Sequence, residues 1–144
     1  MRLRQFSYFV LLIGSLLLLS ACQTKSMQAT TEQLEQFIWQ LQSLDGQKTI
    51  DGTKVTLTIR GDKITGTGGA NRYFAGWVYA DSKLTISPVG ATKRMMMQPA
   101  GVMQQEQRYF TLLQTAQKVE IEGQILILTN NEGRRLEFIP QPEL

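Results

Sequence analysis

The sequence has no histidine, which removes the side chain that catalytic and metal sites use most often. It has a single cysteine, so the chain cannot form an internal disulfide or a metal site of several thiolates. Its acidic residues are scattered over predicted turns and polar strand faces, and no two are placed like the carboxylate pair of a glycosidase. We therefore predict a protein that is not an enzyme and that carries no cofactor.

The N-terminus has the layout of a secretory signal peptide. Arg2 and Arg4 precede an apolar run over residues 9–19, which is shorter than the ~20 apolar residues of a membrane-spanning helix. The run ends in Leu-Ser-Ala-Cys at residues 19–22, which resembles the bacterial lipobox. The resemblance implies cleavage after residue 21 and lipid attachment to Cys22. An ordinary signal peptide, cut nearby and leaving a free Cys22 thiol, is the alternative.

Lipid at Cys22 implies membrane attachment without any contact between the folded domain and the bilayer. Lipoproteins of this type carry several acyl chains, palmitate among them, and two or more chains hold a protein firmly on a membrane. Gln23 follows the cysteine, where an aspartate is the common signal for retention in the inner membrane. The resemblance therefore implies a protein anchored in the outer membrane and facing the periplasm.

Charge and length bound the remaining chain. Removal of residues 1–21 leaves 123 of the 144 residues, which is enough for one domain with a core of its own. The removed segment includes Arg2 and Arg4 and no acidic residue, so the formal net charge falls from +3 to +1. A net charge so close to zero argues against nucleic acid as a partner.

Strand patterns dominate the rest of the sequence. Residues 22–36 are expected to form a tether and a short helical start, in which Thr30 caps the helix and Gln33 bonds back to it. Residues 37–140 are expected to form the folded domain. Alternation of apolar and polar residues, with turn residues between the segments, predicts strands over residues 37–43, 54–60, 63–67, 73–79, 83–87, 118–122, 124–129 and 134–139.

One longer helix is predicted over residues 102–116, a stretch without glycine or proline. Met103, Phe110 and Leu113 are expected to share one side of this helix, with Glu106 and Gln107 between them. The sequence therefore predicts an α+β fold, in which a strongly curved antiparallel sheet of about seven or eight strands packs against one helix.

Two segments stand out as candidate sites. Residues 66–76 read GTGGANRYFAG, and we interpret this segment as a bulge or tight crossover, because no helix, lysine or Ser/Thr follows in the pattern of a phosphate loop. Residues 95–97 are three successive methionines, and Met103 lies nearby. We expect the methionines to fill the junction between sheet and helix. A Cu(I) site of Met95, Met96, Met97 and Met103 is the alternative.

Together these motifs resemble the META/HslJ domain. The resemblance rests on the Gly-Asn loop at residues 66–76, the Thr-Lys-Arg-Met-Met-Met stretch at residues 92–97, and Glu106. The family pattern has cysteines where this chain has Ala70 and Met97. Their joint absence suggests that the two segments are neighbours in space, and we expect Ala70 and Met97 to replace the pair by apolar packing.

The resemblance implies a small envelope protein linked to heat shock, stress response or antibiotic tolerance, with no general catalytic activity. We predict a lipoprotein that serves envelope maintenance by binding a protein or a peptidoglycan-related partner. Its expected binding rim is Asn71, Arg72, Tyr73 and Arg94. A periplasmic copper-binding or metal-tolerance module is the first alternative, and an enzyme acting on the cell wall is the second.

Overall fold

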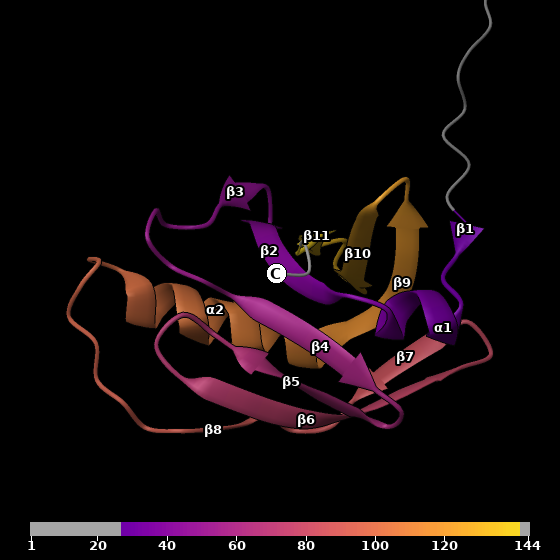
Figure 1. Cartoon of the computed structure of the whole chain (residues 1–144), viewed down its shortest axis with the longest axis horizontal. Coiled ribbons are helices and arrows are strands. Elements are labelled where there is room, and N and C mark those ends of the chain that lie inside the picture. The colour runs from indigo at the N-terminus through magenta and orange to yellow at the C-terminus, as the bar shows by residue number, and fades with distance from the viewer. Residues whose placement is uncertain (1–26, 142–144) are drawn as a thin grey trace, which may run out of the picture.

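The computed structural model describes residues 27–141, which form eleven strands and two helices (Figure 1). The predicted signal peptide, Cys22 and Gln23 lie outside the described residues. Within residues 27–141, no helix is both long enough and apolar enough to cross a bilayer.

The N-terminal part combines a short helix with the first long strand. It runs through β1 (Met27–Gln28), α1 (Thr31–Glu35), β2 (Ile38–Leu44) and β3 (Gln47–Lys48). The predicted cap is confirmed, because Thr30 N donates to Gln33 Oε1 over 3.0 Å and Gln33 N donates back to Thr30 Oγ1 over 3.3 Å. β1 falls inside the expected tether and pairs with residues 120–121 near the C-terminal end of the fold, which local sequence could not predict.

Three hairpins follow in succession. They are built from β4 (Thr56–Arg60), β5 (Lys63–Thr67), β6 (Arg72–Ala80) and β7 (Lys83–Ile86), and β8 (Gly90–Ala91) adds a short pairing with β6. Two-residue turns join β4 to β5 and β6 to β7, and Asp81 and Ser82 in the second turn have φ of 51° and 62°. Such positive φ values give the turn the twist that antiparallel strands need.

The C-terminal part is one helix followed by three strands. α2 (Val102–Thr115) leads directly into β9 (Ala116–Glu122), and β10 (Ile125–Asn130) and β11 (Arg135–Pro140) complete the chain. β11 pairs with β2, so the last strand closes onto the first long one.

The strands form one curved antiparallel sheet that almost closes on itself. Their order is β1-β9-β10-β11-β2-β4-β5-β6-β7, with β3 added to β2 and β8 added to β6. β7 lies against β9 at the seam, and α2 runs along the concave side, where it contacts β7, β10 and β11 (Figure 1). The predicted fold class is therefore confirmed: eight longer strands form a strongly curved sheet around one main helix.

The core fills the space between the sheet and α2. Val55, Leu57 and Ile59 are buried, as their alternation in the sequence predicts. The largest fully buried side chains come from both helices and from six of the longer strands: Trp39, Tyr109, Phe138, Leu34, Leu41, Leu57, Ile59, Ile64, Leu84, Leu113, Leu126 and Leu128.

The packed side of α2 differs from the predicted one. Met103 and Phe110 are only half-buried, whereas Val102, Gln105, Glu106 and Tyr109 are buried. Two of these buried side chains, Gln105 and Glu106, are polar. A prediction of the buried face from apolar residues alone therefore rotated the helix by about one residue position. Glu106, which carries the only buried carboxylate among the described residues, therefore points into the fold.

Candidate functional site

Glu106 holds the glycine-rich loop against α2. Its Oε2 accepts hydrogen bonds from the backbone N–H of Ala70 (3.0 Å) and of Asn71 (2.6 Å), and its Oε1 accepts one from Asn71 Nδ2 (2.7 Å). The Glu106 side chain is 4% exposed. Three donors around one buried carboxylate satisfy a group that would be costly to bury without partners.

Asn71 connects this loop to the segment before α2. Its Oδ1 accepts from the Arg94 backbone N–H (2.6 Å) and from Thr92 Oγ1 (2.8 Å), while its Nδ2 also donates to the Arg94 carbonyl (3.2 Å). The amide group thus pairs with the Arg94 backbone as a neighbouring strand would. We call Glu106, Asn71 and their backbone partners the Glu106–Asn71 clamp.

The glycines of the loop are required by close contacts. A Cβ atom on Gly68 would lie 2.6 Å from the Phe110 ring and 2.7 Å from Glu106 Oε2, and one on Gly66 would lie 2.0 Å from the Thr56 carbonyl oxygen. Gly69 has φ of 117°, which side-chain-bearing residues rarely adopt. The loop therefore has an architectural role, as its sequence predicts, but it is the tight turn of the β5–β6 hairpin and not a bulge or a crossover.

Tyr73 begins the strand after the loop and meets Tyr109 of α2 in the core. The Tyr73 hydroxyl donates to the Thr56 carbonyl (2.8 Å), so the 2.7 Å contact between the two hydroxyls has Tyr109 as donor. Burial raises the pKa of the Tyr73 hydroxyl above its ordinary value. Burial also raises the pKa of Tyr109, and the Tyr73 hydroxyl adds to that shift. The pair therefore stays neutral and binds the helix to the sheet.

The predicted binding rim is only partly at the surface. Arg72 and Arg94 are exposed, but Asn71 is 4% exposed and Tyr73 is 2% exposed. Asn71 and Tyr73 cannot contact a partner directly, because their polar atoms are used inside the fold. Their place in the predicted rim is wrong, and both act instead by holding the backbone from which Arg72 and Arg94 extend.

The methionine segment does not fill the core. Met95 is 83% exposed and Met97 is 81% exposed, and Met96 and Met103 are half-buried. The expectation that the methionines pack the junction between sheet and helix is therefore wrong for Met95 and Met97. Apolar packing of Met97 against Ala70 is wrong for the same reason. The two segments are neighbours, as expected, but the Asn71 side chain joins them.

These findings define one exposed area beside the clamp, made of Arg72, Lys93, Arg94, Met95 and Met97, which we call the arginine–methionine surface. All five side chains are exposed. None of its three cations is within ion-pair distance of an acidic side chain in the described part of the chain. Exposed apolar side chains rimmed by charges are typical of surfaces that bind other molecules.

A separate groove of about 470 Å³ follows the outer side of α2. Met103, Phe110 and Gln107 line it from the helix, and Val89 lines it from the segment after β7. Met103 therefore lines a groove beside α2, whereas Met95 and Met97 are exposed and do not line it. No group of three or more His, Cys, Asp or Glu side chains that could hold a metal ion occurs within residues 27–141.

The clamp role of Glu106 was not predicted from the sequence, although Glu106 was among the residues of the family pattern. A usable signal was present, because Val102, Glu106, Tyr109 and Leu113 follow one another at helical spacing. A carboxylate inside such a row is buried and needs donors of its own. The glycine-rich loop, with several free N–H groups, was the segment that could supply them.

Comparison with known proteins places the fold among solved structures. The family model described as META domain matches residues 32–143. An NMR structure of a protein from Burkholderia xenovorans is similar with a TM-score of 0.62 and 24% identity, over 76% of this chain and 85% of that one. A second NMR structure has a TM-score of 0.64 and 19% identity, over 78% and 96%. No curated protein matches the chain significantly.

Proposed function

Because this chain belongs to the META domain family, and because its arginine–methionine surface is open to solvent, we propose that it is a non-enzymatic lipoprotein that binds a partner in the cell envelope. In this proposal Cys22 carries the lipid, the protein is anchored in the outer membrane, and the domain faces the periplasm. Its role is envelope maintenance or stress tolerance.

The anchoring part of the proposal is supported by the N-terminal sequence. A basic head, a short apolar run and Leu-Ser-Ala-Cys occur in the order that lipoprotein processing requires. Cys22 is the only cysteine, so acylation would leave no free thiol on the domain. An outer-membrane location is supported by Gln23.

The binding part is supported by one observation above all, the exposure of Met95 and Met97. Long apolar side chains with more than four-fifths of their surface in water gain free energy when a partner covers them. The Glu106–Asn71 clamp fixes the backbone of Arg94, the residue before Met95. The entropic cost of ordering this segment on binding is therefore lower. Arg72, Lys93 and Arg94 add attraction for an acidic partner, either a protein segment or the carboxylates of a peptidoglycan-related molecule.

Charge reversal at this surface tests the binding proposal. We expect Arg72→Glu with Arg94→Glu to lower crosslinking from a photoreactive residue at position 97 several-fold in intact cells, and to lower survival under heat stress. Lys83→Glu with Lys118→Glu is the matched control, because both lysines are exposed and lie on β7 and β9. Unchanged crosslinking and survival in the Arg72/Arg94 variant would show that the surface is not used.

The copper alternative is also favoured by one observation, since two exposed thioethers two residues apart are free to reach one soft ion. Titration with Cu(I) under reducing conditions separates the two functions. The partner-binding proposal predicts no tight site. A tight site that is lost in Met95→Leu/Met97→Leu would instead establish the metal module.

An enzyme acting on the cell wall, the second alternative, would turn over peptidoglycan fragments, and the proposal predicts no turnover.

A further inference from the structure

We propose that the end of the domain around β1 and the β9–β10 turn rests on the bilayer that holds the Cys22 lipid, with Ile125 as its apolar contact. The proposal rests on the acylation of Cys22 that the proposed function includes, and it adds an orientation and a second contact surface. Its ligand is a lipid surface.

The covalent chain between lipid and fold is short. Four residues, 23–26, separate Cys22 from Met27, the first residue of β1. A chain reaches at most ~3.6 Å per residue, so five steps give about 18 Å when fully extended. This upper limit is shorter than α2 alone, whose 14 residues span about 21 Å, so the entry point of the chain cannot move far from the headgroups.

The entry point is also fixed on the domain. β1 pairs with β9 through Met27 opposite Ile121 and Gln28 opposite Glu120. Ala29 is then buried, and the capping box of α1 begins at the next residue. Strand pairing on one side and a capped helix on the other therefore fix the place on the domain at which the tether enters.

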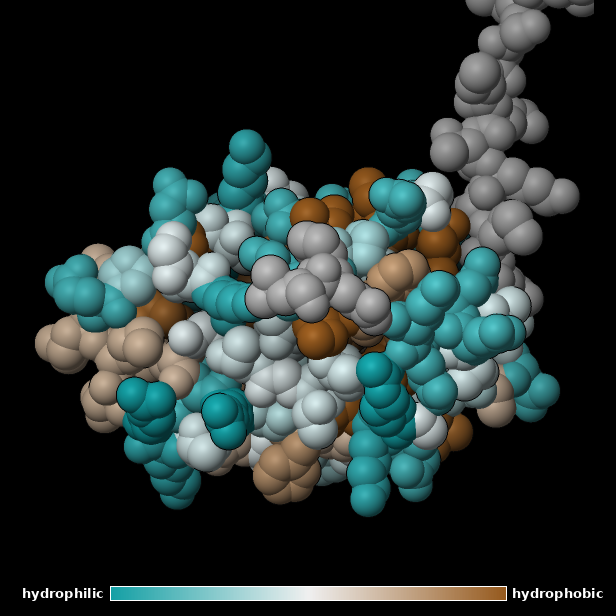
Figure 2. All heavy atoms as spheres, viewed as in Figure 1, coloured by the Kyte–Doolittle hydropathy of each residue, from teal (hydrophilic) through white to brown (hydrophobic). Residues whose placement is uncertain are grey.

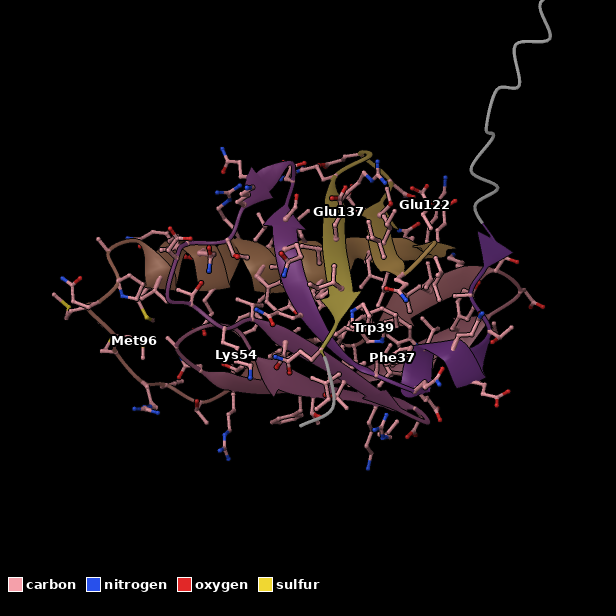
Figure 3. All side chains as sticks on the ribbon, turned by 45° about the horizontal axis from the view of Figure 1, so that its top comes forward. Phe37, Trp39, Lys54, Met96, Glu122 and Glu137 are labelled. Carbon is pink, nitrogen blue, oxygen red and sulfur yellow. The ribbon has the colours of Figure 1, made fainter. Side chains whose placement is uncertain are left out.

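This entry lies at one end of the molecule. Figure 1 shows β1, α1 and the β9–β10 turn grouped together, far from the loop between β8 and α2. Figure 3, which is turned by 45°, shows the same separation, with Glu122 near β1 and Met96 at the opposite end. The arginine–methionine surface therefore points away from the membrane when the β1 end is held against it.

The β9–β10 turn carries an apolar side chain that suits a lipid surface. Ile125 is 40% exposed, opposite Glu122 at the tip of the hairpin. Figure 2 shows hydrophobic side chains exposed over the β9–β10 end of the visible face. An isolated isoleucine would add little by itself, but a lipid anchor within reach makes its contact with the bilayer effectively intramolecular.

Site-specific fluorescence quenching tests the orientation in the full acylated protein. Because Cys22 is the only cysteine and is acylated, a cysteine introduced by Gln124→Cys or by Met97→Cys is a unique label site, and both positions are exposed. Each labelled protein is placed in vesicles of phosphatidylethanolamine and phosphatidylcholine that contain a lipid with a nitroxide headgroup. We expect quenching several-fold stronger at position 124 than at position 97.

Two further variants separate the contributions. A flexible Gly-Ser insertion between Lys25 and Ser26 is expected to bring quenching at position 124 down toward that at position 97. Ile125→Ser is expected to weaken it, whereas Ile139→Ser, an equally exposed isoleucine on β11, leaves it unchanged. Equal quenching at the two label sites in an acylated, vesicle-bound protein would overturn the orientation alone. A protein that is never acylated would overturn the proposed function as well.

Discussion

At the residue scale, Glu106 is the side chain that most other features of the site depend on. It is buried, it accepts from two backbone N–H groups and from the Asn71 amide, and Asn71 in turn holds the Arg94 backbone. No cation lies within ion-pair distance of Glu106 in the described chain. Its role is therefore to fix a loop by charge-assisted hydrogen bonds, each of which is worth about 1.5–3 kcal/mol.

Glu106→Gln tests this role. The amide keeps the size of the carboxyl but replaces one acceptor with an NH₂ donor that would face an N–H group, so we expect a loss of about 1–3 kcal/mol in the free energy of unfolding. Urea unfolding of the lipid-free domain measures it. Glu132→Gln is the control: its carboxylate pairs with Arg134 on an exposed turn, so its loss is expected to cost less than about 1 kcal/mol. An equal effect of the two substitutions would refute the clamp.

The buried tyrosine pair predicts how stability depends on alkaline pH. Burial raises the folded-state pKa of Tyr73 and Tyr109 above the value of about 10 found in unfolded chains. Both hydroxyls are neutral in the folded state, so their contribution is complete below about pH 10 and is lost as pH rises above that value. Unfolding midpoints at a series of pH values should fall more steeply above pH 10 in the native protein than in Tyr73→Phe/Tyr109→Phe. Parallel curves would contradict this.

At the scale of elements, the sequence predicted the longer strands and α2 to within about two residues at each end. Alternation in residues 54–60 and the turn residues after each strand carry strong local signals, and the Thr30 cap was visible as a capping box. β1, β3 and β8 were not predicted, because each has only two residues, too few to show an alternating pattern. β1 and β8 also depend on strands that do not follow them directly in the chain, whereas β3 pairs with β2 across the turn at residues 45–46.

The site shows the same division between local and distant causes. The architectural role of the glycine-rich loop follows from its own residues and was predicted, although the loop is a hairpin turn and not a crossover. The burial of Asn71 and Tyr73 depends on which face of α2 packs against the sheet, and so does the exposure of Met97. That face was predicted wrongly because the polar residues Gln105 and Glu106 face inward. Polar side chains with partners far away in the sequence defeat a prediction based on hydrophobicity.

The contact between the glycine-rich loop and α2 is tested by Gly68→Ala. The added methyl would meet the Phe110 ring and Glu106 Oε2 at 2.6 Å and 2.7 Å, so we expect overpacking to cost about 1–3 kcal/mol. Gly76→Ala is the control, since the added methyl would meet the Ser87 Oγ and Cβ atoms at 3.2 Å and 3.4 Å, and a shift of a few tenths of an ångström accommodates it while the Gly76 N–H keeps its bond to Ser87 Oγ. Thermal unfolding midpoints should drop clearly for the first substitution and little for the second. A drop of similar size for both would argue against a specific contact.

At the scale of the whole molecule, the fold separates two ends. The chain enters at β1, and the clamp presents Arg72, Arg94, Met95 and Met97 at the other end (Figures 1 and 3). In the proposed function a lipid at Cys22 holds the first end at the outer membrane and leaves the second end free for a partner. Every buried side-chain nitrogen and oxygen atom in the described residues has a hydrogen-bond partner, which suits a rigid binding module.

Both the proposed location and the proposed orientation depend on a lipid at Cys22. The most direct measurement is the intact mass of the protein purified from the membranes of cells that produce it, compared with the same preparation from Cys22→Ala cells. We expect a chain that begins at Cys22 and carries several acyl chains, and that is lost from the membrane in the variant. A chain cut elsewhere, unacylated and recovered from the soluble periplasmic fraction would contradict it.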